Sequence, residues 1–310
     1  MIHIVEEQVR EILSVNKAVE LLENCFGRLG VNQAVNHPRR RIKMHNRNLL
    51  HYMAAGDNES GYFGAKIYAT SATAGARFIV ILFDTETVSP VATIDADALG
   101  QIRTGAASGV ATKFMANPGS QTLGVIGTGW QAETQLAALA CVCTLKKIKV
   151  YGRSEKRRDA FAEKMSVQLG VDIESMATAE ETVRNSDIVI TITNSSTPVF
   201  EGSWLQAGVH VNAAGSNSAK RREVDSTTIE AATLIAADSV EQAKVEAGDL
   251  VQAYEEGLLE WERVQELSTI VRGVIPGRKS PDTITLFESQ GLALEDITVA
   301  AYVYEQLCQA

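Results

Sequence analysis

The sequence predicts an α/β protein that combines a doubly wound parallel sheet with a second, β-rich domain. From residue 117 onward, short apolar strands alternate with helices, which is typical of parallel strands joined by crossover helices. Residues 35–97 instead hold several β-rich runs separated by turns. With 310 residues, the chain is long enough for both domains.

The first part of the chain begins with a helix and continues as a sheet. Ala18, Leu22, Phe26 and Leu29 recur at helical spacing and predict an amphipathic helix over residues 16–30. The runs that predict an antiparallel or mixed sheet are Arg40–Met44, Leu49–Ala54, Tyr62–Ala69, Phe78–Phe83 and Pro90–Asp95. A helix over residues 98–116 follows and ends at the breaker Asn117-Pro118-Gly119.

The second part alternates strands and helices. The predicted strands are Thr122–Ile126, Lys147–Tyr151, Asp187–Thr193, Val209–Ala213, Thr233–Ala236 and Thr283–Leu286. Helices are predicted at Gln131–Cys143 and Lys156–Leu169, and a last one at Leu294–Cys308. We therefore expect one domain at residues 117–286 and a second that joins residues 1–116 to residues 287–310.

Composition excludes several classes of protein. The net charge of −9 argues against a nucleic-acid or anionic-membrane surface, and no apolar run is long enough for a membrane helix. The N-terminus is acidic and lacks a basic-then-apolar leader. The four cysteines are scattered without metal-site spacing. We expect a cytoplasmic protein with reduced thiols and no metal site.

A glycine-rich turn points to a dinucleotide. The first strand of the second domain runs into Gly127-Thr128-Gly129-Trp130-Gln131-Ala132, which fits the pattern GxGxxA, and a helix follows. The first glycine permits a tight turn, the second lets backbone N–H groups approach a pyrophosphate, and Ala132 keeps the helix close to the strand. This predicts a Rossmann-type domain whose turn binds the coenzyme.

The end of the second strand favours NADP(H), with NAD(H) possible. An NAD site normally has Asp or Glu here to accept the ribose hydroxyls, whereas this chain has Gly152 and Arg153, with Ser154 and Arg157 nearby. A guanidinium at this position pairs with a 2′-phosphate. The alternative is that Arg153 and Arg157 only begin a solvated helix, and Glu155 shows that the segment is not purely basic.

Two polar loops follow later strands of the same sheet. Thr193-Asn194 and Gly215-Ser216 stand at carboxyl ends of strands, where ligands bind in open α/β sheets. We expect both loops to flank the nicotinamide, although simple turn chemistry also accounts for such residues.

Cationic residues of the first domain suggest an acidic substrate. Lys66 interrupts an apolar run, which costs desolvation energy unless the lysine has a partner or a task. Arg103 lies in a helix rich in small residues, and Arg39-Arg40-Arg41 forms a cluster. A small carboxylate suits such a group, although surface ion pairs would also explain the arginines.

Three motifs, in this order along the chain, resemble those of the ornithine cyclodeaminase/μ-crystallin family. They are the "RTxAxS" helix around Arg103, the glycine turn, and the segment Phe287-Glu288-Ser289-Gln290-Gly291-Leu292-Ala293-Leu294-Glu295-Asp296, which is similar to the family's "FxSxGxAxxD". The resemblance implies a homodimer paired through its β-rich domains and hydride transfer between nicotinamide and an imine carbon. It further implies that Arg40, Lys66 and Arg103 hold the substrate carboxylate. We include Gly291 among the coenzyme-binding residues.

One departure from the family pattern narrows the choice among the family's reactions. Cyclodeaminases of the family carry an Asp where this chain has Asn217, and an amide is not a base. The resemblance therefore favours the ketimine reductase branch, with NADPH-dependent reduction of a cyclic imino acid. Δ1-Pyrroline-2-carboxylate, giving L-proline, is the first candidate and Δ1-piperideine-2-carboxylate, giving L-pipecolate, the second.

Catalytic roles and alternatives remain open at this point. Lys66 either completes the carboxylate clamp or delivers a proton, and Asn217 and Ser289 orient the imine or the nicotinamide amide. The alternative reactions are ornithine cyclodeamination and alanine dehydrogenation. A non-enzymatic protein that binds NADPH and a ligand is the third possibility.

Overall fold

The computed structural model describes residues 1–71 and 73–309, which form two compact units. The first unit consists of Met1–Ala106 and Gly291–Ala310, and the second of Ala107–Gln290. The boundaries expected from the sequence lay at residues 116/117 and 286/287. The first division instead falls inside helix α3 (Asp97–Met115), because the second half of this helix packs with the second unit.

The first unit is built on a six-stranded sheet. Its strands are β1 (Ile2–Ile4), β2 (Ala34–Lys43), β3 (Leu49–Asp57), β4 (Tyr62–Ser71), β5 (Gly75–Asp84) and β6 (Pro90–Asp95). The order is β1-β6-β5-β4-β3-β2, in which β1 pairs with β6 in parallel and all other pairs are antiparallel. The mixed sheet expected from the sequence is confirmed, with β1 as an additional edge strand.

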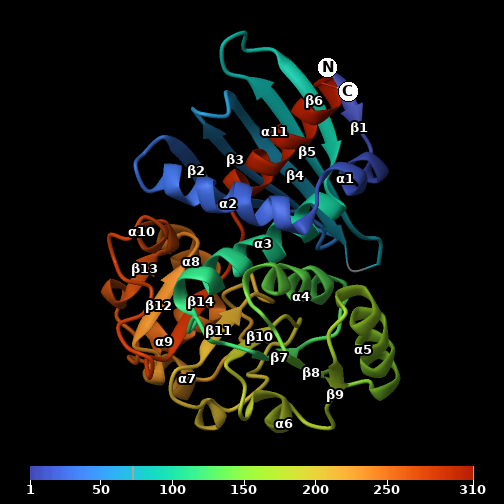
Figure 1. The fold of residues 1–310 in the computed structure, drawn as a ribbon. Coiled ribbons are helices and arrows are strands. Elements are labelled where there is room, and N and C mark those ends of the chain that lie inside the picture. Colours follow the sequence, from blue (N-terminus) through green and yellow to red (C-terminus); the bar gives the residue numbers. More distant parts are fainter. Residues whose placement is uncertain (72, 310) are drawn as a thin grey trace. The chain divides into compact units, whose positions relative to one another are not determined.

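Helices cover one face of this sheet (Figure 1). They are α1 (Glu6–Ile12), α2 (Val15–Leu29) and the C-terminal helix α11 (Ala293–Gln309). The side chain of Ser14 caps α2 by accepting a hydrogen bond from the backbone N–H of Lys17. Helix α11 packs on β2, β3, β4 and β5, so a segment from the end of the chain lies against its beginning.

The two faces of the sheet differ in residue type because successive side chains alternate between them. The covered face holds Met53, Lys66, Val80 and Ile94, all of them buried. The opposite face is apolar and partly exposed, and its side chains include Leu50, Tyr52, Phe63, Ile67, Ile79, Ile81 and Phe83. Phe63 and Phe83 stack on this face with ring centroids 5.8 Å apart.

The second unit is an eight-stranded, wholly parallel sheet. Its strands are β7 (Thr122–Ile126), β8 (Lys147–Tyr151), β9 (Ile173–Ser175), β10 (Ile188–Thr191), β11 (His210–Ala213), β12 (Leu234–Ala237), β13 (Val264–Glu266) and β14 (Thr285–Glu288). Their order is β13-β12-β14-β11-β10-β7-β8-β9. The predicted doubly wound α/β class is confirmed.

Helices and two apolar cores sandwich this sheet. The helices are α4 (Trp130–Val142), α5 (Glu155–Leu169), α6 (Ala179–Val183), α7 (Ser226–Ala231), α8 (Val240–Glu246), α9 (Gly248–Glu255) and α10 (Leu267–Val271). One core contains Val125 with Leu136 of α4, and the other contains the neighbouring Ile126 with Leu250 of α9. Strands buried on both faces explain why the sequence reads here as continuous apolar runs.

The strand order fixes where a ligand can bind. From β7 the chain adds β8 and β9 on one side, and then returns to place β10 on the other side. Ligands of open α/β sheets bind beyond the carboxyl ends of the strands at such a reversal. The loops that follow β7, β8, β10 and β11 stand at this edge.

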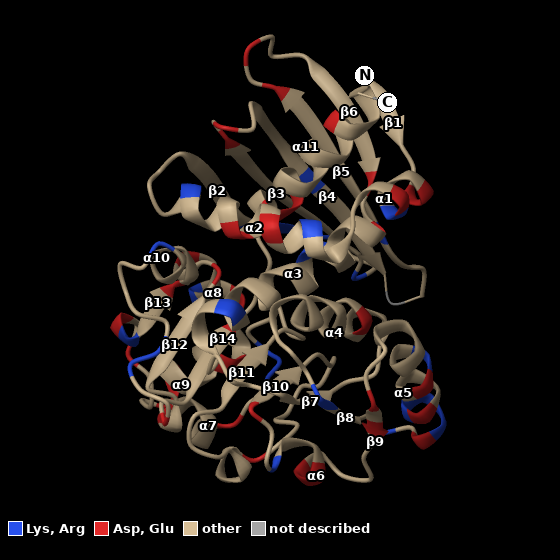
Figure 2. Ribbon diagram, viewed as in Figure 1, with Lys and Arg blue, Asp and Glu red and all other residues tan. Residues whose placement is uncertain are grey.

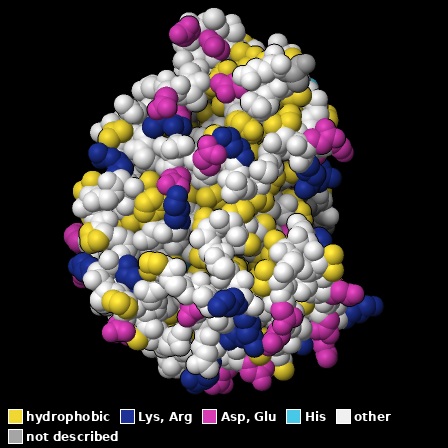
Figure 3. Space-filling model, in the orientation of Figure 1, with side chains coloured by type: hydrophobic (Ala, Val, Ile, Leu, Met, Phe, Trp, Pro, Cys, Tyr) yellow, Lys and Arg dark blue, Asp and Glu magenta, His cyan; other side chains and the backbone are white. Residues whose placement is uncertain are grey.

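No helix among the described residues is long and apolar enough to cross a membrane. Acidic and basic side chains are interspersed along the exposed helices, as on α5 (Figure 2), and over the face seen in Figure 3.

Candidate functional site

The glycine turn after β7 has the geometry that a dinucleotide requires. Gly127 has φ +119°, and a Cβ there would collide with the carbonyl oxygen of Ile192. Gly129 is the N-cap of α4 and has open space around it, so a ligand can approach the first turn of the helix. Trp130 is exposed, and the buried Oε1 of Gln131 has no hydrogen-bond partner among the described residues. This cradle fits a pyrophosphate.

Two arginines just after the end of β8 are exposed to solvent, whereas a third is buried and hydrogen-bonded. Arg153, Ser154 and Arg157 are exposed, and the side chain of Ser154 makes no capping bond to α5. Arg158 is buried and donates to the carbonyl of Gly152 and to Ser175 Oγ. Arg153 and Arg157 therefore remain available to a ligand at this strand end.

One buried carboxylate joins the loops after β10 and β11. Glu223 Oε1 accepts hydrogen bonds from Thr193 N and Thr193 Oγ1, both at 2.6 Å. Its Oε2 accepts from Gly215 N at 2.7 Å and from Thr191 Oγ1 at 3.1 Å. A Cβ on Gly215 would collide with this carboxylate and with the carbonyl of Thr193, which explains the glycine.

The other predicted residues of these loops differ in exposure. Ser216 is buried, whereas Asn194 and Asn217 are exposed. Ser289 is buried just beyond β14, and its N–H donates to the carbonyl of Ala213 on β11. Thr193, Gly215 and Ser289 thus all lie at the carboxyl ends of neighbouring strands.

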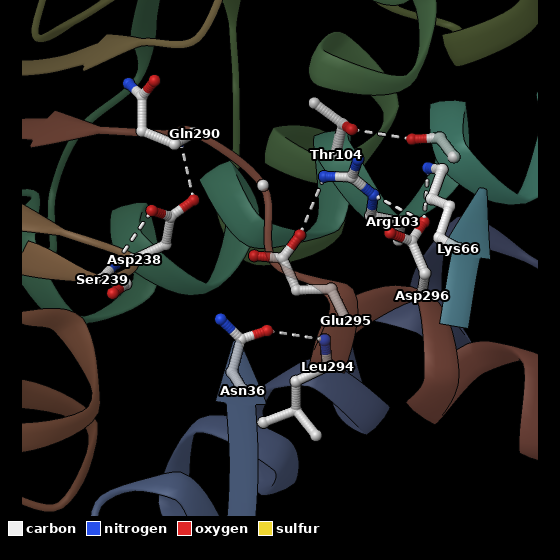
Figure 4. A network of polar contacts seen from close by, with 12 residues as sticks. Asn36, Lys66, Arg103, Thr104, Asp238, Ser239, Gln290, Leu294, Glu295 and Asp296 are labelled. Atoms are coloured by element: carbon white, nitrogen blue, oxygen red, sulfur yellow. Dashed lines mark hydrogen bonds and ion pairs between the residues drawn. The ribbon is translucent and has the colours of Figure 1, made fainter. Parts of the chain in front are cut away.

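The first unit brings two of the predicted cations together in a buried cluster. Lys66 Nζ on β4 lies 2.7 Å from Asp296 Oδ1, and Arg103 Nε on α3 lies 3.1 Å from the same oxygen. Arg103 NH1 also contacts Glu295 Oε2 at 2.9 Å. Figure 4 shows both cations directed toward the start of α11, which supplies the two carboxylates.

Two glycines make room for these long side chains. A Cβ on Gly100 would stand 3.0 Å from Lys66 Nζ, and a Cβ on Gly291 would collide with the guanidinium of Arg103. Gly291 also has φ +74°, which favours glycine, and its carbonyl accepts a hydrogen bond from Arg39 NH2 at 3.2 Å. The structure therefore places Gly291 beside the cation cluster of the first unit.

The third cation of the cluster is Arg39 and not Arg40. Arg39 is buried, whereas Arg40 is exposed opposite Tyr52 on the other face of the sheet. The register of β2 shifts by a bulge between His37 and Arg40, and this bulge turns Arg39 toward the helices. The sequence-based choice of Arg40 is corrected to Arg39 because a one-residue slip exchanges the two faces of a strand.

The electrostatics of the cluster suit one additional negative charge. Burial lowers the pKa of Lys66 to about 8; Asp296 opposes this shift, whereas Arg103 and Arg39 add to it. Burial also acts against the charge of Arg103, but Asp296 and Glu295 raise its pKa above the usual value. Three cations and two carboxylates leave a net charge of about +1. A monoanionic ligand would neutralise the cluster.

Sequence reasoning chose Arg40 from the arginine cluster in place of Arg39, and it missed Asp296 and Glu223. Asp296 is the last residue of the C-terminal motif that begins at Phe287, but no pattern in the sequence shows that it faces Lys66. Glu223 follows the cationic run Lys220-Arg221-Arg222 and is nevertheless fully buried.

The doubly wound sheet and the glycine turn after β7 together define a dinucleotide-binding protein. The model of the ornithine cyclodeaminase/mu-crystallin family matches residues 1–310. The chain is 42% identical over 229 residues to a Δ1-pyrroline-2-carboxylate reductase from Bacillus cereus, and the match covers 74% of this chain and 70% of that protein. This chain belongs to the ornithine cyclodeaminase/mu-crystallin family, as its motifs indicated.

Solved structures of related enzymes match both units. The Thermococcus litoralis Δ1-pyrroline-2-carboxylate reductase, in complex with NADH and L-proline, matches with a TM-score of 0.95 and 32% identity, over 100% of this chain and 98% of that one. An archaeal alanine dehydrogenase dimer with bound NAD matches with a TM-score of 0.93 and 30% identity, over 99% and 96%.

Proposed function

We propose that this chain reduces Δ1-pyrroline-2-carboxylate to L-proline with a nicotinamide coenzyme, NADPH being preferred. The chain is an oxidoreductase that acts on C=N bonds. In the reaction, the imino acid, the reduced coenzyme and one proton give the amino acid and the oxidised coenzyme. When bound, the coenzyme supplies the hydride to the imine carbon.

The observation that carries the proposal is the buried cation cluster. Its net charge of about +1 matches a monocarboxylate, and we assign the carboxylate to Arg39 and Arg103. Asp296 Oδ2 is buried and accepts no hydrogen bond within the described residues, so it is open to the N–H of a protonated imine. Holding the imine in one orientation is positional catalysis.

Lys66 is the proposed proton donor to the imine nitrogen. With a pKa of about 8, it is mostly protonated at neutral pH and still able to release the proton. Asp296 holds its Nζ in place at 2.7 Å. The exposed amide of Asn217 offers no base where cyclodeaminases of the family carry Asp, which speaks against ornithine cyclodeamination.

We assign the coenzyme to the second unit. Gly127, Thr128, Gly129, Trp130 and Gln131 would hold the pyrophosphate, and Arg153, Ser154 and Arg157 the 2′-phosphate. The loops with Thr193, Asn194, Gly215 and Ser216 would flank the nicotinamide, with Ser289 nearby.

We also propose a homodimer that pairs the open faces of the six-stranded sheets. This face carries Leu50, Tyr52 and Phe63, each between 36% and 39% exposed, and a monomer leaves them in water. One related structure is a dimer. Sedimentation at micromolar concentration should give about twice the chain mass of 33.5 kDa. A single 33.5 kDa species would refute the pairing.

A steady-state screen tests the function. Pyrroline-, piperideine- and thiazoline-type carboxylates are each combined with NADPH and with NADH, and we expect the pyrroline acid to be the best substrate. Ornithine with NAD, and pyruvate with ammonia and NADH, test the two rival reactions. Ammonia release from ornithine, or faster turnover of pyruvate than of any cyclic imine, would reject the proposal. Coenzyme binding without any turnover would favour a non-enzymatic binding protein.

A further inference from the structure

A group of four buried carboxyls lies beyond the carboxyl ends of the strands in the second unit, and the proton-donating role of Lys66 does not use it. The group consists of Glu223, Asp238, Asp249 and Glu288. The hydrogen-bond donors around each oxygen show which backbone and side-chain groups each carboxyl holds.

Asp249 and Glu288 are two carboxyls whose burial favours the protonated form. Both N–H groups of Glu223 and Val224 donate to Asp249 Oδ1 at 2.7 Å. Asp249 Oδ2 and Glu288 Oε2 have no hydrogen-bond partner among the described residues, and burial raises the pKa of both carboxyls. Asp238, in contrast, accepts backbone N–H groups from Ser239 and Gln290 (Figure 4).

Glu223 is the carboxyl with a full set of donors. Two backbone N–H groups and two threonine hydroxyls converge on its two oxygens. Thr193 Oγ1 in turn accepts the N–H of Ser195, so the carboxylate orders the loop after β10 as well as Gly215 after β11. Backbone N–H groups can only donate, and an ionised carboxylate is the one state that accepts all four bonds.

We propose that Glu223 is a positioning residue of the coenzyme site, whose carboxylate fixes Thr193 and Gly215 where the nicotinamide is held. This rests on the proposed function, which assigns both loops to the nicotinamide. Among the described residues, no hydrogen bond joins Glu223 to the pyrophosphate turn or to the 2′-phosphate arginines, so its influence should fall mainly on the nicotinamide end of the coenzyme.

The charge of Glu223 makes the effect dependent on pH. Burial, together with the nearby carboxylate of Asp249 from α9, raises its pKa to about 7, and the hydrogen bonds from Thr193 and Gly215 limit this rise. Glu288 on β14 faces the same group, whereas the adjacent Arg222 donates to Val224 O, Glu256 and Ser226. When Glu223 takes up a proton, its carboxyl O–H faces N–H and O–H groups that also donate. Below about pH 7, at least one of the four hydrogen bonds is therefore lost or reversed.

The test compares NADPH with 2′-phospho-ADP-ribose, which has the same phosphates but lacks the nicotinamide. Dissociation constants are measured for both between pH 6 and 8, with NADH and ADP-ribose in parallel. Glu223→Gln sets an amide N–H₂ against the N–H of Thr193 or Gly215. It should weaken NADPH about tenfold and leave 2′-phospho-ADP-ribose within about twofold. In the wild type, the dissociation constant of NADPH divided by that of 2′-phospho-ADP-ribose should rise as the pH falls through about 7. In Glu223→Gln this ratio should not change with pH.

Two further variants keep the outcome decisive. Glu266→Gln is the matched control, because this carboxyl also accepts a backbone N–H, from Val240, and has a raised pKa, yet it contacts neither loop. It should change neither constant. Thr191→Val removes one hydrogen-bond donor to Glu223, so the pH at which the ratio of the two dissociation constants changes should be higher than in the wild type. This variant tests the proposal even if Glu223→Gln fails to fold.

Equal weakening of both probes by Glu223→Gln, no weakening at all, or an inflection that Thr191→Val leaves in place would each overturn the positioning role. A wild type that binds neither NADPH nor NADH would instead refute the proposed function.

Discussion

Lys66→Met is expected to lower kcat for imine reduction about 10²- to 10⁴-fold, the contribution typical of a positioned general acid. Methionine has nearly the same length and keeps the apolar contacts of the buried stem, but it carries no proton. Asp296 still has the Nε of Arg103 at 3.1 Å, so the carboxylate is not left without a cation. Steady-state rates with the pyrroline acid and saturating coenzyme provide the measurement.

The pH profile separates proton donation by Lys66 from a merely electrostatic role. Because burial lowers its pKa to about 8, the wild-type kcat should decline as the pH rises through 8, where the proton is lost. Lys66→Arg keeps a positive charge beside Asp296 but cannot release a proton at these pH values, so it should stay slow and show no inflection near 8. A fast Lys66→Arg enzyme would mean that Lys66 only clamps the carboxylate. Coenzyme binding, which involves the other unit, should be unchanged in both variants.

Arg153→Ala is expected to weaken NADPH far more than NADH. Loss of a charge-assisted bond to the 2′-phosphate should cost roughly 1.5–3 kcal/mol, which is about 10- to 150-fold in the dissociation constant. NADH lacks this phosphate and should be bound about as well as before. Titration of both reduced coenzymes, followed by their fluorescence, measures the two constants.

A surface arginine of the same unit serves as the control for Arg153→Ala. Arg184 is exposed and pairs with Glu180 at 2.6 Å, so Arg184→Ala removes a similar charge at a distance from the strand end. It should leave the preference for NADPH intact. Equal losses for NADPH and NADH in Arg153→Ala would refute the 2′-phosphate role, and an unchanged NADPH constant would do the same.

Local patterns predicted most of the parallel sheet and its glycine turn. Apolar runs of strand length, a glycine that needs φ +119°, and a following helix are all set within a few residues of each other. The same reasoning identified Lys66 and Arg103, because a lysine in an apolar run and an arginine among small residues stand out without a structure.

The remaining site residues depend on contacts that local patterns do not carry. Arg39 faces inward because of a bulge in β2, and a bulge has no signature in three consecutive arginines. Asp296 meets Lys66 only because α11 returns to the first unit after some 230 residues. Glu223 is buried with its carboxylate bonded to the loops after β10 and β11, and no local pattern in the sequence indicates these contacts.

Hydride transfer to an imine carbon can be followed by isotope. Reduced coenzyme that carries deuterium at the transferable position of its nicotinamide is incubated with Δ1-pyrroline-2-carboxylate and the enzyme, and the amino acid formed is examined by mass spectrometry and NMR. We expect L-proline with a single deuterium at Cα. Unlabelled proline, or oxidation of the coenzyme without any proline, would contradict the reaction proposed for this chain.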